Sequence, residues 1–406
     1  MIALSIAGIA LLANKVGASL AAVPLSAVLL FNQSFYWGFL PFMAGFIAFL
    51  FLIISWLEPR QFSWQKLVIQ ALLFMLVYFS HILWFVVTLL TVPVLILASP
   101  GRIAKFRALS FSALPAITLA LSWYPSLHNK WAGKGFDMSP YWIVPLHDRL
   151  HPLYAANAIY GLKADFKLFI LLTVVLFILG GILRSITGKQ KIISVPLLVL
   201  ALIVLTAYLA MPDQYNNTIL FAARWLPYVF IFLLLGCLAP LQAQKWSIGV
   251  LYFAFAVLGA HTLLTASSWL KMEKEDLSGL QQAMEKLPAK QRVLGLDILQ
   301  TSPTINTLRP FLAIHAYTQV LKGCETNFSF AEHASSLVTY KTTPLKPFQI
   351  GLEWAPERVS MNDVYYFDYV LANADDEAHG KLASYLKIRP VTYEGRWRLY
   401  SVRQAD

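Results

Sequence analysis

The chain has 406 residues, of which 58% are hydrophobic and 13% are charged, and its net charge is +11. This composition excludes an ordinary water-soluble protein, because one soluble core cannot hide so much apolar surface, whereas lipid accepts it directly. The positive charge does not indicate nucleic-acid binding, since the excess lies before Met272, where 17 basic residues face five acidic ones, against 15 and 16 from Met272 onward.

The first 271 residues contain about ten apolar segments that we interpret as membrane-crossing helices. The predicted spans are 2–13, 17–31, 36–57, 67–80, 82–98, 108–121, 168–184, 193–211, 224–241 and 248–269. We divide the apolar run 67–98 into a hairpin near His81, because a single helix of that length would reach about 48 Å, well beyond a hydrocarbon core of roughly 30 Å.

Lys and Arg residues fall on alternate connections between these segments. One side carries Lys15, Arg60, Lys66, Arg102, Lys105, Arg107, Arg184, Lys189, Lys191 and Lys245. The intervening connections, around 32–35, His81 and 212–223, have no Lys or Arg. Short cytoplasmic loops collect these residues, so the sequence predicts a polytopic α-helical protein of a bacterial inner membrane, with its uncharged connections outside.

The beginning of the chain departs from this pattern. Segment 2–13 is too short to span a bilayer alone and must start on the outer face if Lys15 is cytoplasmic. We expect either that an upstream span and outer loop are missing from this sequence or that the first helix is tilted or half-inserted.

Two regions on the predicted outer face are large enough to carry a function. The loop 122–167 is rich in Trp and Tyr, which suits a membrane interface, and we expect short interfacial helices over 141–146 and 153–160. The tail 272–406 follows the last outward span and reads as a small α/β domain, so we place the domain boundary after residue 271.

Strands and helices alternate in this tail. Helices are predicted over 277–287, 310–321 and 375–386, and strands over 292–298, 368–373 and 397–402, which suggests an open sheet with parallel pairs. The residues after the strand DYVLAN include no glycine-rich phosphate loop, so nucleotide binding by the tail is not expected.

Intramembrane and outer-loop ionisable residues are the candidates for chemistry, because such groups are costly in lipid. Arg224 opens a span at the water interface, where its guanidinium could hold a lipid phosphate or anchor the helix end beside Trp225. His81, at the hairpin tip, could transfer protons, bind phosphate or cap a short turn.

The motif HDRLH places His147, Asp148, Arg149 and His151 on the aromatic loop. This cluster could bind an anion or a divalent metal, or contain an Asp148–Arg149 pair in a solvated loop. Asp137, Asp148 and Asp213 are the candidate general bases, whereas Asn32 and Gln33 lie in an outer turn and could bind a sugar. The residues identify no cofactor and no dedicated metal site.

Several stretches resemble the GT-C superfamily of membrane glycosyltransferases. They are FNQSFYWGFLPFMAGFIAFLFLIISW (31–56), LVYFSHILWF (76–85), AARWLPYVFIFLLL (222–235) and, in the tail, FDYVLAN (367–373) and WRLYSV (397–402). The resemblance implies transfer of a sugar from a polyprenyl-phosphate carrier to an envelope glycan or protein acceptor on the outer face. It also implies that Arg224 contacts the carrier phosphate and that His81 lines the cavity.

The sequence departs from that superfamily in its acidic residues. The family carries its catalytic carboxylate in the first outer loop, but this chain has no acidic residue before Glu58, and Ala223 replaces the acid that often precedes the arginine. Two alternatives therefore stay open. The chain could be a polymerase or ligase of lipid-linked glycans that uses Arg149, or a non-catalytic assembly partner whose tail binds another envelope component.

Overall fold

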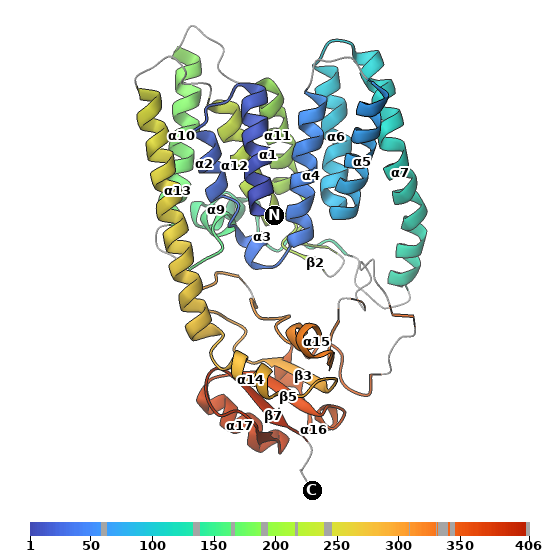
Figure 1. Cartoon of the computed structure of the whole chain (residues 1–406), viewed down its shortest axis with the longest axis vertical. Coiled ribbons are helices and arrows are strands. Elements are labelled where there is room, and N and C mark those ends of the chain that lie inside the picture. The colour runs from blue at the N-terminus through green and yellow to red at the C-terminus, as the bar shows by residue number, and fades with distance from the viewer. Residues whose placement is uncertain are drawn as a thin grey trace. The chain divides into compact units, whose positions relative to one another are not determined.

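The computed structural model describes residues 1–57, 63–132, 139–163, 167–187, 194–215, 218–238, 246–307, 309–329, 331, 340–341 and 346–402. The chain divides into two compact units, Met1–Leu264 and Thr265–Asp406. The first unit is helical, and the second contains a small sheet with helices (Figure 1).

The first unit consists mainly of α-helices, the last of which continues into the second unit. They are α1 (Ile2–Val16), α2 (Ala22–Val28), α3 (Gln33–Tyr36), α4 (Leu40–Trp56), α5 (Trp64–Ser80), α6 (Ile82–Leu97), α7 (Arg102–Ala132), α8 (Leu146–Arg149), α9 (Pro152–Ile159), α10 (Lys167–Thr187), α11 (Val195–Ala210), α12 (Leu226–Cys237) and α13 (Trp246–Lys271). A two-stranded antiparallel hairpin, β1 (Gln214–Tyr215) and β2 (Thr218–Ile219), and the 3₁₀ turn η1 (Ala223–Trp225) separate α11 from α12. Figure 1 shows the longer helices standing beside one another, with α3, α9 and β2 at one end of the bundle.

Two helical segments are long and apolar enough to cross a membrane. They are Arg102–Pro125 in α7 and Ile248–Asp276, which comprises most of α13 and the turn after it. Seven shorter apolar helices of 10–17 residues accompany them in the described part of the chain. The apolar side chains that remain exposed on α7 and α13 include Phe111, Leu121, Ile248 and Leu263.

The predicted hairpin at His81 is confirmed. His81 has extended backbone angles between α5 and α6, and its Nδ1 accepts a hydrogen bond of 3.2 Å from the backbone N–H of Leu83. This side chain therefore ends one helix and caps the next. Gly45 on α4 permits the close packing here, because a Cβ at that position would lie 2.7 Å from Trp84.

Other predicted segments were wrong in extent or type. The span 17–31 contains only α2, whose seven residues reach about 10 Å and cannot cross a bilayer. Helix α7 extends from Arg102 to Ala132, so it takes in basic residues expected before the span and the first residues of the predicted outer loop. The expected helix 141–146 is wrong: Tyr141 pairs with Gln214 in an antiparallel bridge, 142–145 are not helical, and Leu146 begins α8. The expected helix 153–160 is confirmed as α9.

The second unit is built on a five-stranded sheet in the order β4–β3–β5–β7–β6. Its elements are the π-turn η2 (Met272–Asp276), α14 (Leu280–Lys286), β3 (Arg292–Asp297), α15 (Ala316–Lys322), β4 (Glu325–Thr326), η4 (Pro356–Arg358), α16 (Met361–Val364), β5 (Tyr369–Asn373), α17 (Asp376–Leu386), β6 (Arg389–Pro390) and β7 (Trp397–Ser401). Strand β3 is parallel to both β4 and β5, whereas β7 is antiparallel to β5 and β6.

The expected parallel pairs are therefore confirmed for β3 with β4 and β5, although β7 is antiparallel to its neighbours. Strands β3, β5 and β7 lie where their apolar runs predicted them. Helix α15 ends at Gly323, which has a left-handed φ of 63°, and Asp375 caps α17 through the backbone N–H of Ala378. The buried side chains of β3, β5 and the helices that cover them form one apolar core.

Candidate functional site

A group of buried polar side chains lies at the end of the first unit that contains α3 and η1. Arg224 is the central residue, because it comes from η1 and is 2% exposed. Its Nη2 donates a hydrogen bond of 2.5 Å to the Ile219 carbonyl of β2, whereas its Nε is buried and has no partner in the described chain. The short polar turn before α12 thus places a guanidinium inside the bundle rather than at its surface.

Aromatic rings surround this guanidinium. Its central carbon lies 3.6 Å from the ring centre of Phe39, 5.3 Å from that of Phe221 and 5.8 Å from that of Phe42. Ring faces attract a cation, but they do not neutralise it. None of the ion pairs found among the described residues involves Arg224. Among the residues that the structure describes, this buried positive charge therefore has one carbonyl acceptor and no carboxylate partner.

The structure brings His81 to the same group of residues. His81 lies close enough to Arg224 for the charge of the arginine to act on its imidazole, and the His81 and Phe42 rings meet edge to face at 5.1 Å between centroids. Arg224 and His81 are 143 positions apart in the sequence, so packing of the α5–α6 turn against η1 creates this proximity. The two residues singled out by the resemblance are therefore neighbours in space.

Asn32 is also part of this end of the bundle, and it is fully buried. Its Oδ1 caps α3 by accepting the backbone N–H of Ser34 at 2.9 Å, and its Nδ2 donates to the Leu29 carbonyl at 2.9 Å. These contacts engage both polar atoms in the helix cap. Gln33, the first residue of α3, is half-buried.

The predicted Asp148–Arg149 pair is wrong. Arg149 is 2% exposed and its Nη2 forms an ion pair of 2.9 Å with Asp213, 64 positions away. Its other nitrogens donate to backbone carbonyls of Val144, Tyr208, Leu209 and Met211. Asp213 also accepts the backbone N–H of Val144 at 2.8 Å, so this candidate base is held in a structural network.

The other residues of HDRLH face solvent. His147 pairs with Asp148 at 3.4 Å, and the Nδ1 of His151 caps α9 by accepting the backbone N–H of Leu153 at 3.2 Å. Asp137 lies outside the described residues. No group of three or more His, Cys, Asp or Glu side chains in the described ranges could hold a metal ion. The side chains of HDRLH therefore make separate contacts, and the alternative of an anion or metal cluster within this motif is not supported.

His261 is a buried ionisable residue that the sequence analysis did not consider. It lies on α13, is 1% exposed, and neither ring nitrogen has a partner in the part of the chain that the structure describes. Its ring packs 5.8 Å from Phe31 and 5.4 Å from Tyr160, between centroids. The signal that could have found it is a single histidine within a long apolar run.

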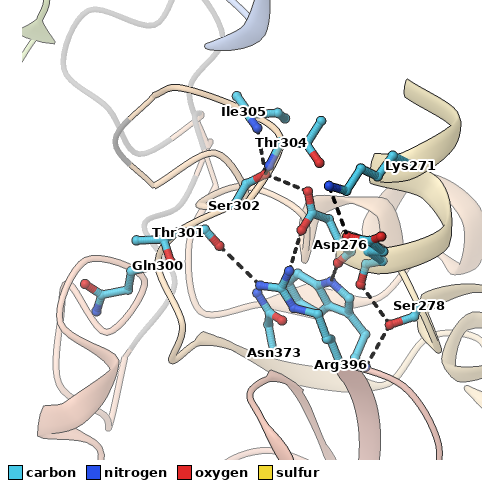
Figure 2. A network of polar contacts seen from close by, with 12 residues as sticks. Lys271, Asp276, Ser278, Gln300, Thr301, Ser302, Thr304, Ile305, Asn373 and Arg396 are labelled. Atoms are coloured by element: carbon cyan, nitrogen blue, oxygen red, sulfur yellow. Dashed lines mark hydrogen bonds and ion pairs between the residues drawn. The ribbon is translucent and has the colours of Figure 1, made fainter. Parts of the chain in front are cut away.

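A second polar cluster, in the second unit, was also missed (Figure 2). Asp276 is fully buried and pairs with Arg396, and its Oδ2 accepts the Ser302 hydroxyl at 2.5 Å. The Ser302 hydroxyl oxygen in turn accepts the backbone N–H groups of Thr304 and Ile305 at 2.9 and 2.8 Å. These contacts tie the residues before β7 and after β3 to the end of the long helix.

Comparisons with known proteins identify no relative: no family model, no curated protein and no solved structure matches this chain.

Proposed function

We propose that this chain is a multi-spanning membrane protein that binds the phosphate of a lipid-linked sugar at Arg224, as part of a GT-C-like transfer of the sugar to an envelope acceptor. The observation that carries the proposal is the buried guanidinium of Arg224, which has no carboxylate partner in the described chain. A charge in that position is costly unless a ligand neutralises it.

The helical bundle supports a membrane location. Besides the two long apolar helices, the seven shorter ones include α4 and α5, each of 17 residues and about 26 Å long, a length that suits a thin or locally thinned bilayer. The Lys and Arg pattern then assigns the basic connections to the cytoplasm and the Arg224 end of the bundle to the outer face. Under this orientation the second unit is extracytoplasmic, in a bacterial inner membrane.

An anionic group such as a phosphate suits Arg224 better than a neutral ligand does. The planar guanidinium can donate two parallel hydrogen bonds to phosphate oxygens, and its Nε is buried and unpartnered in the described chain. The rings of Phe39 and Phe221 beside it would accommodate the first apolar carbons of a lipid tail. In a transfer reaction the same contacts would stabilise the charge that develops on the leaving lipid phosphate.

Among the described residues, Arg224 is the proposed phosphate-binding group, and we assign no general base. Asp213 is engaged by Arg149, and Asp148 lies beside His147 on the exposed loop. The alternative polymerase or ligase would need Arg149 to meet substrate, but that guanidinium already donates to Asp213 and to backbone carbonyls. A non-catalytic protein that binds a lipid phosphate is the remaining alternative.

The test is phosphate binding by Arg224 variants of the full chain in lipid nanodiscs. Farnesyl phosphate is the probe, with farnesol and inorganic phosphate as the comparisons that separate lipid, phosphate and combined recognition. We expect Arg224→Lys and Arg224→Met to weaken farnesyl phosphate binding at least tenfold, which is about 1.4 kcal/mol, because the point charge of lysine cannot reproduce the bidentate fork and methionine has no charge. The exposed Arg102→Met variant is the matched control and should bind as the wild type does.

Thermal unfolding of the same variants separates a ligand site from a structural one. Arg224→Met removes a buried charge that lacks a counter-ion in the described chain, so it should leave the melting temperature unchanged or raise it. A large drop in melting temperature would make Arg224 a structural residue, and wild-type farnesyl phosphate binding in both variants would refute the phosphate site.

A further inference from the structure

The sheet of the second unit is fixed at one edge to the end of a long apolar helix. Asp276, the last residue of that helix, pairs with Arg396 and accepts the Ser302 hydroxyl (Figure 2). Its backbone carbonyl accepts the indole N–H of Trp397 at 3.0 Å. Trp397 pairs in the sheet with Asn373, the last residue of β5, so the helix ends at the carboxyl ends of β5 and its parallel neighbour β3.

This carboxyl edge lies close to the bilayer that α13 crosses in the function proposed above. The apolar stretch 248–270 is about 34 Å long, enough for a hydrocarbon core of roughly 30 Å, so its end at Leu270 lies near the boundary of the core. Only six residues, or about 9 Å of helix, separate Leu270 from Asp276. The headgroup region is about 5–8 Å thick on each side, so the carboxyl edge meets the bilayer surface.

Exposed apolar side chains lie at the same edge. The turn 350–354 carries Ile350 and Trp354, which are 76% and 39% exposed. Glu353 in this turn lines the same small cleft as Asp297, the last residue of β3, which places the turn at the carboxyl edge. A third side chain, Tyr317 of α15, is 55% exposed.

The segment that leads into α15 packs against this turn. The central carbon of the Arg309 guanidinium lies 5.5 Å from the ring centre of Trp354, and the guanidinium donates a hydrogen bond to the Trp354 carbonyl. The rings of Phe311 and Trp397 meet edge to face at 6.2 Å between centroids, so this segment also lies at the carboxyl edge. Tyr317 follows in the first turn of α15. We call Ile350, Trp354 and Tyr317 the apolar patch.

The residue types of the apolar patch suit a bilayer surface. Trp and Tyr are enriched at membrane interfaces, where the ring and its polar edge are both accommodated, and Ile350 adds apolar area. The guanidinium of Arg309 beside Trp354 could reach lipid phosphates. Asp375 and Asp376, at the start of α17, follow β5 at the same edge. Burial of apolar surface, and not lipid charge, would therefore supply most of the attraction.

We propose that the apolar patch of Ile350, Trp354 and Tyr317 lies in the headgroup region of the bilayer that α13 crosses and holds the second unit against the membrane surface. The amino ends of β3 and β5, with the Arg292–Asp368 ion pair, then face water. This inference rests on the membrane location proposed above, and not on phosphate binding at Arg224.

The experiment places nitroxide labels at single cysteines of the full chain in phosphatidylcholine nanodiscs. The two buried native residues, Cys237 and Cys324, are first replaced by alanine. Ile350→Cys and Tyr317→Cys then each place one label in the apolar patch. The collision reagents are oxygen, which concentrates in lipid, and a water-soluble nickel chelate.

Tyr365→Cys is the matched control for these labels. Tyr365 is 67% exposed, and its neighbour Tyr366 packs 4.8 Å from the Arg292 guanidinium at the start of β3, the opposite edge of the sheet. We expect the ratio of oxygen to nickel-chelate collisions to be several-fold higher at Ile350 and Tyr317 than at Tyr365. Equal ratios at the three positions would place the patch in water. Few collisions with either reagent would mean that a protein surface, such as a second copy of the chain, covers it. Either result would overturn the proposal.

A label at Leu263→Cys, an exposed position of α13, reports separately on the membrane location. If this label collided mainly with the nickel chelate, α13 would not lie in lipid, and the proposed function and the patch would fail together. If it collided mainly with oxygen while Ile350 behaved like Tyr365, only the contact of the patch with the bilayer would be refuted.

Trp354→Glu tests whether the patch itself makes the contact. The ring is exposed, so its replacement should leave the fold intact. In this variant the label at Tyr317 should collide several-fold more often with the nickel chelate, because a carboxylate opposes burial in the bilayer surface. Tyr365→Glu, which adds the same charge at the opposite edge, should leave the Tyr317 label unchanged. An unchanged label at Tyr317 in Trp354→Glu would contradict a bilayer contact through the patch.

Discussion

Arg149 and Arg224 belong to the same helical unit and are each 2% exposed, yet their surroundings are opposite. Arg149 has a carboxylate at 2.9 Å and donates to several backbone carbonyls, so its charge and its N–H groups are both satisfied. Arg224 has one carbonyl acceptor within the described ranges and is surrounded by aromatic rings. A buried charge with a protein counter-ion and hydrogen-bond acceptors helps to maintain the fold. A buried charge without them destabilises the folded state, and a ligand of opposite charge can offset that destabilisation.

The largest effect expected from this contrast is at Arg149. Arg149→Met should destabilise the first unit by about 3–5 kcal/mol, because Asp213 would remain buried without its counter-charge. Adding Asp213→Asn should recover part of that loss, and the unfolding free energies of the single and double variants measure the coupling. If Arg149→Met were as stable as the wild type but had lost substrate binding, Arg149 would be the ligand-binding arginine and the contrast would be reversed.

How much of the fold and of the candidate site could be predicted from the sequence depends on how far apart in the chain the interacting residues lie. The break at His81 followed from helix length against bilayer thickness, and β3 and β5 followed from compact apolar runs. The Arg149–Asp213 pair did not, because nothing local indicates a partner 64 positions away, and the adjacent Asp148 offered a false one. The meeting of Arg224 with His81 was implied only by the resemblance, since tertiary packing creates it.

The same contrast recurs in the second unit between Asp276, which is paired with Arg396, and His315, which has an unpartnered nitrogen in the described chain. Burial lowers the pKa of His315 from 6.5 to about 4. The unfolded chain therefore binds a proton first as the pH falls below 6.5, so stability is full above that pH and declines toward pH 4, by about 3 kcal/mol. Burial raises the pKa of Asp297, which partly offsets this decline at the acid end.

Hydrogen-exchange protection factors of the β3 and β5 amides, measured in the full chain from pH 7 to pH 4.5, report this decline for the second unit alone. Replacing His315 with Leu should flatten the profile. The pKa of His379, which burial also lowers, supplies a residual slope common to both proteins. If the pH dependence of protection had the same slope in His315→Leu, the folded protein would stabilise a protonated His315 as fully as Arg396 stabilises the Asp276 carboxylate.

The smallest expected effect separates the two roles of His81. Its Nδ1 caps α6, so His81→Ala should cost about 1 kcal/mol of stability, whereas His81→Asn keeps a capping oxygen and should cost less. If His81 also assists Arg224 with a phosphate, both variants should weaken farnesyl phosphate binding, because the amide of asparagine is shorter and cannot carry the imidazole proton. If His81 is only a cap, His81→Asn should restore stability and binding together. Unfolding and farnesyl phosphate binding, measured on the same two variants, therefore decide whether Arg224 binds the phosphate alone or together with His81.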